Sequence, residues 1–509
     1  MFKKIVYLSF IFLFACASVP EEQTTRTPDL TLTDVSHNPL PSVTQTLVAP
    51  TNTFTPSPTQ SISKTPSPSR VPTTTPVPEP TSTPQKSNDN IFGVTVYINE
   101  PTEVITKMVA IGTNWTRQDV IWAMIETEPG IRNWDLNFEQ DLKNVVKAGL
   151  QLILILGETP PWALKSGFNC GAVAEDKFSV LGDFAFDLVK RYSAPPYNVK
   201  YWEMWNEPDV KGFLGDWGDP TDTQYYGGYY YGKMLKVVYS RIKAADPQAQ
   251  VLVGGLLLDC DPNDPPSGRT CTEAKFLKGI LESGAGPYFD GVSFHAYDFY
   301  TGKGTYYNPN WHSAWNTTGP VSIAKANYLK GLLASYGYNQ KYLVHTETAV
   351  FKGPNVLNPP CQETDPVVLA NIEVTKVYYV VQSYTVALAQ GWKANVWYTG
   401  LGVRCSGLLK PDLSPYPAYY AYQFTRQKLG SAVFVRKLSG YPQVMGYEFR
   451  VRNRRIWVVW SLDGNAHTID LPSLPVLVNR VGDDGQPIQE TSALTLTINL
   501  SPRFIEFEP

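Results

Sequence analysis

The sequence predicts an α/β fold, a (β/α)8 TIM barrel, followed by a small C-terminal all-β sandwich-like domain and preceded by a disordered linker. Over residues 91–429, apolar β-rich runs alternate with amphipathic helical stretches, which is typical of βα units. Over residues 430–509, short alternating segments are separated by turns, which favours antiparallel strands. Over residues 17–90, Pro, Ser and Thr dominate, so no hydrophobic core can form there.

Residues 1–16 have the composition of a signal peptide. Lys3 and Lys4 precede an apolar run, Ile5 to Ala15, that is too short to span a bilayer but suits a signal-peptide core. The run ends in Leu-Phe-Ala-Cys, which resembles the bacterial lipoprotein signal, where cleavage exposes a Cys that is then acylated. We expect an exported lipoprotein, anchored to a membrane at Cys16 and displayed at the cell surface. An ordinary secretory signal with an incidental Cys16 is the alternative.

The segment 17–90 predicts a stalk. Between Pro20 and Asn90 the only aromatic residue is Phe54, and Thr-Pro-Ser-Pro repeats at 55–58 and 65–68 favour extended, polyproline-like backbone. Such a segment acts as a semi-rigid spacer between a membrane and a folded domain.

Eight apolar runs are the predicted barrel strands. They are Gly93–Tyr97, Asn114–Ile121, Gln151–Gly157, Val199–Asn206, Gln250–Leu257, Gly291–Ala296, Tyr342–Thr348 and Ala394–Thr399. Helical spacing of apolar residues lies between them, for example over Gln224–Ala245 and Val367–Gln390. No glycine-rich phosphate loop follows the first run, so a closed barrel is favoured over an open doubly wound sheet.

The C-terminal domain is predicted from strand-like runs such as Arg455–Ser461 and Leu494–Leu500, with turns at Asp463-Gly464 and Asp484-Gly485. It has no obvious run of exposed aromatic residues, which favours a sandwich packed on the barrel over a carbohydrate-binding module.

The cysteines suggest two disulfides in an oxidising compartment. Cys260 and Cys271 bracket one loop, and Cys361 and Cys405 lie in two later loops, so we pair them in that way and leave Cys170 unassigned. None has the spacing of a metal site, and the five His are scattered. We therefore predict no metal and no organic cofactor.

Composition limits the possible partners. The chain has 43 Lys+Arg against 46 Asp+Glu, a net charge of −3, so no global basic field exists to hold nucleic acid. Only 17% of residues are charged whereas 13% are aromatic, which suits neutral ligands such as sugars.

Two carboxylates end predicted strands on opposite sides of the barrel. Glu207 ends the fourth strand within Trp-Asn-Glu-Pro, and Glu347 ends the seventh. Residues at the carboxyl ends of barrel strands meet at one mouth, where active sites lie. Opposed carboxyl groups are what glycosidic-bond hydrolysis needs, one protonated to assist the leaving oxygen and one ionised to attack the anomeric carbon.

This motif resembles the clan A glycoside hydrolases, which place an acid/base Glu after strand four and a nucleophilic Glu after strand seven. The stretch after strand four, ending Ala244-Ala245-Asp246-Pro247 before Val251-Leu252-Val253-Gly254-Gly255, is similar to families 39 and 5. The resemblance covers about Ile91 to Leu429. It implies that Glu207 is the acid/base, that Glu347 is the nucleophile and that Asn206 hydrogen-bonds the sugar 2-hydroxyl.

The resemblance also implies further substrate-binding residues. Either His295 or Tyr297 at the end of strand six would contact the nucleophile, and Arg117 on strand two would support it by a charge-assisted bond. Trp397, near the end of strand eight, resembles the Trp that forms the floor under the reacting sugar.

Other polar and aromatic residues near the strand ends have two interpretations. Glu203 shares the parity of Glu207 and is read as a structural, paired charge inside the barrel. Glu158, after strand three, lines the cleft in one interpretation but has no opposing partner. The aromatic residues of Tyr297–Asn316 either form a wall for the substrate or pack on one another. The same two interpretations apply to Trp217 and to the tyrosines of Tyr225–Tyr231.

Together these observations predict a retaining glycoside hydrolase that cleaves O-glycosidic bonds of β-linked glycans, of the β-xyloside or β-glucan type, through a covalent intermediate. The retaining mechanism predicts carboxyl groups about 5 Å apart. Two alternatives remain, a non-catalytic glycan-binding surface lipoprotein and a transglycosylase that uses the same intermediate. The sequence leaves the sugar, the linkage and the oligomeric state open.

Overall fold

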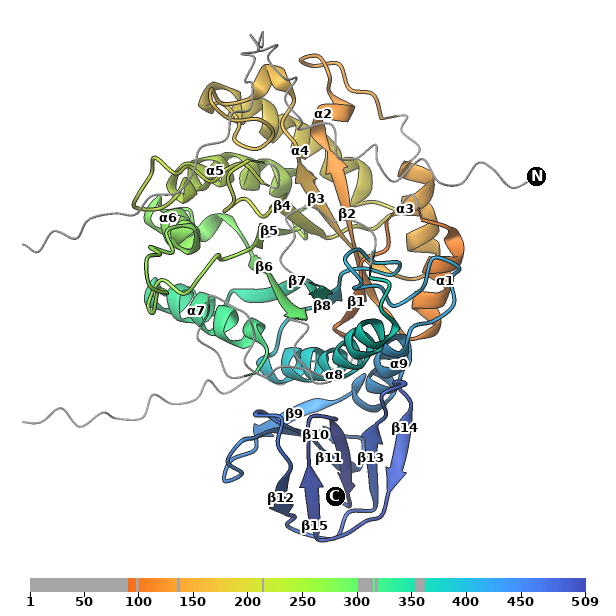
Figure 1. Cartoon of the computed structure of the whole chain (residues 1–509). Helices are drawn as coiled ribbons and strands as arrows, with labels where there is room; N and C mark the ends of the chain where they lie inside the picture. Colours follow the sequence, from red (N-terminus) through yellow and green to blue (C-terminus); the bar gives the residue numbers. More distant parts are fainter. Residues whose placement is uncertain are drawn as a thin grey trace, which may run out of the picture. The chain divides into compact units, whose positions relative to one another are not determined.

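The computed structural model describes residues 90–97, 100–134, 138–212, 215–300, 315, 319–352, 361 and 363–509. Eight parallel strands form a closed barrel in the order β1 to β8, with β1 paired to β8 (Figure 1). The strands are β1 (Phe92–Val94), β2 (Trp115–Ile121), β3 (Gln151–Gly157), β4 (Tyr201–Asn206), β5 (Gln250–Leu256), β6 (Gly291–Tyr300), β7 (Tyr342–Lys352) and β8 (Asn395–Trp397). The predicted (β/α)8 barrel is confirmed.

Helices surround this barrel (Figure 1). They are α1 (Thr102–Ala110), α2 (Trp122–Ile125), α3 (Phe138–Lys147), α4 (Phe178–Tyr192), α5 (Gly228–Ala245), α6 (Phe276–Glu282), α7 (Val321–Ser335), α8 (Pro366–Gln390) and α9 (Pro417–Leu429). Helix α8 begins where Asp365 accepts hydrogen bonds from the amides of Val367 and Val368, and it ends at Gly391, whose φ of 68° suits glycine. Most of its residues are buried because strand and helix neighbours cover it on several sides.

The barrel interior changes character along the strands. At the amino-terminal end, Trp115, Ile153, Leu252 and Val344 form an apolar cluster with neighbouring side chains. Residues two positions further along a strand point to the same face, so Arg117 follows Trp115 into the interior. The carboxyl end of the barrel is therefore lined by polar and charged side chains above an apolar base.

The C-terminal region forms two antiparallel sheets. One has the order β14-β13-β16-β11-β10-β9 and the other pairs β12 with β15. The strands are β9 (Val433–Lys437), β10 (Val444–Val451), β11 (Arg454–Ser461), β12 (His467–Asp470), β13 (Leu477–Val481), β14 (Pro487–Glu490), β15 (Thr495–Ile498) and β16 (Arg503–Phe507). The predicted all-β character of the C-terminal region is thereby confirmed.

Alternation along β11 divides the larger sheet into two buried faces. Trp457 and Val459 belong to a core shared with the β12–β15 pair, whereas Ile456, Val458 and Trp460 belong to the large core that includes the barrel helices. The hydroxyl of Tyr378 on α8 also donates to Asp483, at 2.6 Å. Apolar and polar contacts thus join the β-domain to the barrel, which agrees with a packing role.

Both predicted disulfides are present, Cys260–Cys271 and Cys361–Cys405. The first closes the loop after β5, and the second joins the segment before α8 to the loop after β8. Cys170 is buried and belongs to neither disulfide. Among the residues that the structure describes, no helix has both the length and the apolar character needed to cross a bilayer. The predicted signal peptide, the anchor at Cys16 and nearly all of the 17–90 linker lie outside the described residues.

Candidate active site

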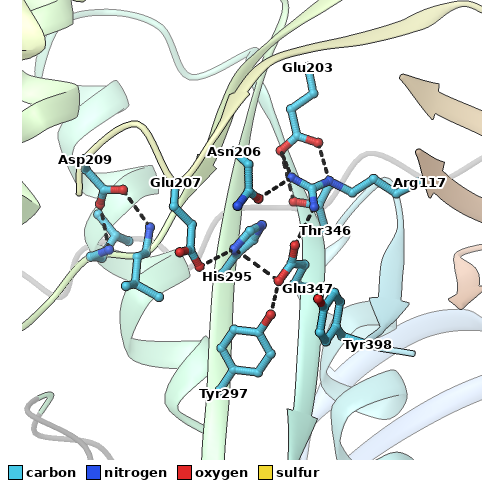
Figure 2. Close-up of polar contacts among 12 residues, drawn as sticks. Arg117, Glu203, Asn206, Glu207, Asp209, His295, Tyr297, Thr346, Glu347 and Tyr398 are labelled. Atoms are coloured by element: carbon cyan, nitrogen blue, oxygen red, sulfur yellow. Dashed lines mark hydrogen bonds and ion pairs between the residues drawn. The ribbon is translucent and has the colours of Figure 1, made fainter. Parts of the chain in front are cut away.

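Glu207 and Glu347 face each other at the carboxyl ends of the strands (Figure 2). Glu207 directly follows β4, where its amide donates to the carbonyl of Gly255 at 3.0 Å, and Glu347 lies within β7. They are only 4% and 6% exposed. One carboxylate oxygen of each lies within 4.8 Å of the other and of a His295 ring nitrogen.

The Glu347 carboxylate receives two direct hydrogen bonds. Arg117 donates from Nη1 to Oε1 at 2.5 Å, and the hydroxyl of Tyr297 donates to Oε2 (Figure 2). Nδ1 of His295 lies 3.6 Å from the same Oε2. Of the two alternatives from strand six, Tyr297 is therefore the direct partner of Glu347.

Arg117 is held in place from its other side. Glu203, which is fully buried, accepts from Nε at 2.7 Å and from Nη2 at 3.1 Å, and Asn206 accepts from Nη2 at 2.8 Å. Thr346 donates to Glu203 at 3.3 Å. The bidentate pairing orients the guanidinium toward Glu347. Glu203 thus points into the barrel and is paired with a positive charge, as its parity with Glu207 predicted. Because its Oδ1 accepts from Arg117, the orientation of the Asn206 amide is also set.

Glu207 has a different surrounding. Its closest polar partner is Nδ1 of the fully buried His295, at 2.9 Å from Oε1. Burial lowers the pKa of His295 well below its usual value, so the imidazole stays neutral. A side chain at Gly255 would collide with this ring, since an added Cβ would lie 2.1 Å from Nε2. The glycine therefore permits the close approach of His295 to β5.

The surroundings separate the proton affinities of the two carboxyl groups. Burial and then the neighbouring Glu347 raise the pKa of Glu207 well above its usual range. Burial also raises the pKa of Glu347, to about 7, but the adjacent Arg117 guanidinium acts in the opposite direction. The geometry thus favours a protonated Glu207 beside an ionised Glu347.

The structure corrects the prediction for Trp397. The ring is fully buried, its Nε1 donates to the carbonyl of Ser406 at 2.9 Å, and its centroid lies 6.0 Å from that of Tyr379 on α8. Trp397 therefore faces the helix layer and not the mouth. Tyr398, the next residue, lies beside Glu347 instead (Figure 2), and its hydroxyl accepts from that of Tyr97 after β1.

Two acidic residues extend the polar lining on the side of β2 and β3. Asp119 follows Arg117 at i+2 on β2 and is exposed, and Glu158 directly follows β3. Burial, with a contribution from Asp119, raises the pKa of Glu158 to about 7. Asp119 was not predicted from the sequence, although its parity with Arg117 was a usable signal. Tyr97, Tyr398, Asp209 and Lys325 were not predicted either.

The described aromatic residues near the site mostly pack internally. Trp315 is buried and donates from Nε1 to the carbonyl of Leu258 at 2.8 Å, and Tyr300 is 5% exposed. Trp217 packs edge-on against Trp205 with centroids 5.0 Å apart, and the hydroxyl of Tyr231 donates to the carbonyl of Met204. These contacts favour self-packing for them. Tyr306, Tyr307 and Trp311 lie outside the described residues.

Among the described residues, Glu207, His295 and Glu347 also lie close enough together to surround a cation. The guanidinium of Arg117 already provides a positive charge on Glu347, so a metal ion would meet repulsion there. We assign no metal or cofactor to this site.

Comparison with known proteins gives structural neighbours only. No protein-family model matches the chain, and no curated protein matches it. A family 39 glycoside hydrolase from the gut symbiont Bacteroides cellulosilyticus WH2 is 19% identical, with a TM-score of 0.61. The match covers 83% of this chain and 81% of the hydrolase chain. A GH30 endoxylanase from Clostridium papyrosolvens C71 is 13% identical, with 84% and 98% covered and a TM-score of 0.54.

A third neighbour, wild-type BuGH86 in complex with neoagarooctaose, is 14% identical, covers 84% of this chain and 76% of its own, and has a TM-score of 0.54. At these identities the likeness establishes a shared fold. The fold is thus that of family 39, family 30 and other clan A glycoside hydrolases, in agreement with the resemblance found in the sequence.

Proposed function

We propose that this protein is a retaining glycoside hydrolase whose acid/base is Glu207 and whose nucleophile is Glu347. The observation that carries the proposal is the pair of buried carboxyl groups with oxygens within 4.8 Å of each other, of which only Glu347 is bonded to an arginine. This separation supports retention, because inverting enzymes need about 6.5 to 9.5 Å to admit a water.

In the first step, a lone pair on Glu347 attacks the anomeric carbon while Glu207 transfers its proton to the glycosidic oxygen, whose bond to that carbon breaks. In the second step, the ionised Glu207 takes a proton from water, and the resulting hydroxide displaces Glu347 from the sugar. Arg117 and Tyr297 stabilise the carboxylate that departs.

The proposed substrates are β-linked glycans of the β-xyloside or β-glucan type. The support is the neighbour described as a GH30 endoxylanase and another described as a bifunctional glucanase-xylanase, CelM2, which has a TM-score of 0.50 at 12% identity. Differences in the loops change the substrate specificity of proteins with this fold, so the sugar has to be measured.

We also propose that the protein is exported and anchored by a lipid at Cys16. Labelled fatty acid should be incorporated into the wild type and not into Cys16→Ala.

The direct test is hydrolysis of a panel of aryl β-glycosides and soluble β-glycans by the purified full-length protein and its Glu347→Ala variant. We expect cleavage of at least one member and a loss of at least about 10⁴-fold in the variant. Glu508→Ala, at an exposed position in the β-domain, is the matched control and should retain full activity. Undiminished cleavage in Glu347→Ala would contradict the assigned nucleophile.

The same panel separates the two alternatives. Binding of a glycan without cleavage, measured by calorimetry, would favour a non-catalytic surface protein. Transfer of the sugar to an added acceptor in preference to water, measured by product analysis, would favour a transglycosylase.

A further inference from the structure

A buried lysine lies behind the candidate acid/base. Lys325 on α7 is 6% exposed, and its ammonium donates to the carbonyls of Leu257 at 2.5 Å and His295 at 2.9 Å. Neither acceptor carries a formal charge. Burying an ammonium is costly, so its retention at this position calls for a reason beyond two main-chain bonds.

A buried carboxylate approaches the same peptide group from the other side. Asp209, which is 1% exposed and lies two residues after Glu207, accepts from the amide of Leu257 at 2.9 Å and from that of Leu258 at 2.8 Å. The main chain of Leu257 is therefore held by opposite charges, Asp209 at its amide and Lys325 at its carbonyl.

Both charges connect to Glu207 through short routes. Lys325 donates to the carbonyl of His295, whose ring contacts Glu207. Asp209 lies two residues after Glu207, in the same loop (Figure 2). In a poorly solvated interior, such charges are weakly screened. Asp209 favours the protonated form of Glu207, and Lys325 favours the ionised form. Burial lowers the pKa of Lys325 to about 8, so the ammonium is charged at neutral pH.

Other charged groups also face these residues. The charges of Glu347 on β7 and Arg117 on β2 act on Glu207, and the neutral His295 on β6 contacts it. Lys325 is influenced by Asp209, Glu207, Asp298 on β6 and Asp259 after β5, all of which favour its charged form. Among the described residues, Lys325 and Asp209 combine burial, hydrogen bonds to one shared peptide group and an electrostatic effect on Glu207.

We propose that Lys325 and Asp209 are positioning residues, a buried pair of opposite charges that holds the Glu207 loop against β5 and β6 and sets the pH range in which Glu207 keeps its proton. This inference rests on the proposed function, because it assigns the pair a purpose in acid catalysis. The two charges act in opposite senses, so their removal has opposite consequences.

The test compares the pH dependence of kcat/KM for the wild type, Lys325→Met and Asp209→Asn. Loss of the positive charge should move the alkaline limb to higher pH, and loss of the negative charge should move it to lower pH, each by about one pH unit. Lys325→Arg should restore the wild-type limb. The matched control is Lys330→Met, because Lys330 lies on the same helix and also donates to a carbonyl, that of Gln390.

A second readout does not depend on turnover. In protein labelled with ¹³C at the glutamate carboxyl carbon, the resonance lost in Glu207→Gln reports the titration of Glu207 directly. We expect the same opposite shifts, with folding of each variant verified by its thermal transition. Shifts in the same direction, or none in either readout, would overturn the proposal. If no glycoside is cleaved, the proposed function fails, yet the resonance still decides whether the pair acts on Glu207.

Discussion

The two sides of the barrel mouth each hold a buried glutamate, but the neighbours of the two glutamates differ. On the β7 side, Glu347 is in direct contact with a guanidinium and a phenol. On the β4 side, Glu207 contacts a neutral imidazole, and the charges of Asp209 and Lys325 act on it without a direct hydrogen bond. Both carboxyl groups are buried, so burial alone cannot distinguish an acid from a nucleophile. The neighbours, each supplied by another strand or helix, make the distinction.

After Glu347→Ala, the largest effect in this comparison is expected from Glu207→Ala. Without its acid, the enzyme should lose about a thousandfold in kcat/KM on glycosides with poor leaving groups. Aryl glycosides that need no protonation should lose much less, because Glu347 remains. Steady-state kinetics on a series of leaving groups measures this split, and added azide should restore turnover. An equal loss on every leaving group would contradict the acid role.

The next effect is expected from Glu203→Gln, which leaves Arg117 without its bidentate partner. The guanidinium should turn away from Glu347, with a loss of about a hundredfold in kcat and a smaller change in KM. Glu203→Asp, which keeps the charge, should recover part of the rate. Full activity in Glu203→Gln would mean that Arg117 needs no support.

Tyr297→Phe should have a smaller effect, of about tenfold, and a defined pH signature. The phenol stabilises the ionised form of Glu347, so its removal should raise a pKa that already stands at about 7. Activity needs Glu347 ionised, and the acid limb of kcat/KM should therefore move to higher pH. An unchanged acid limb, measured beside His295→Asn as a second variant of β6, would show that Tyr297 does not act on Glu347.

The smallest effect on activity is expected from Trp397→Phe. Because the ring packs against α8, the change should leave kcat/KM within about twofold while lowering the free energy of unfolding by about 2 kcal/mol. Tyr398→Phe is the matched variant on the mouth side, where we expect the reverse, a loss of activity with little loss of stability. Thermal denaturation and kinetics on both variants check the pair, and a large activity loss in Trp397→Phe would contradict its placement outside the mouth.

Local patterns predicted most of the barrel. The run Gln151–Gly157 is observed with the same limits, because a strand buried on both faces is a continuous apolar stretch. Strands β6 and β7 extend to Tyr300 and Lys352, beyond the predicted ends, because they continue to pair with each other there. That extension depends on a partner strand and leaves little signal in either segment.

The error at Trp397 has a related cause. In the three-residue β8, Asn395 and Trp397 share a parity, and Asn395 contacts Ser383 on α8. Parity assigns both to the outer face, which leaves the mouth to Tyr398. A short strand carries too little alternation for its register to be read from the sequence.

The sequence alone determined the order of strands and helices and the two disulfides. It also determined the two glutamates, which end strands on opposite sides of the barrel. Each of these features leaves a local pattern or spacing. The tertiary structure decided which charges act on each glutamate. Arg117 and Glu347 are 230 positions apart and in contact, and Lys325 reaches the His295 carbonyl from a helix on the outside of the barrel. Proton affinity depends on distances between such groups, and only closure of the barrel creates those distances.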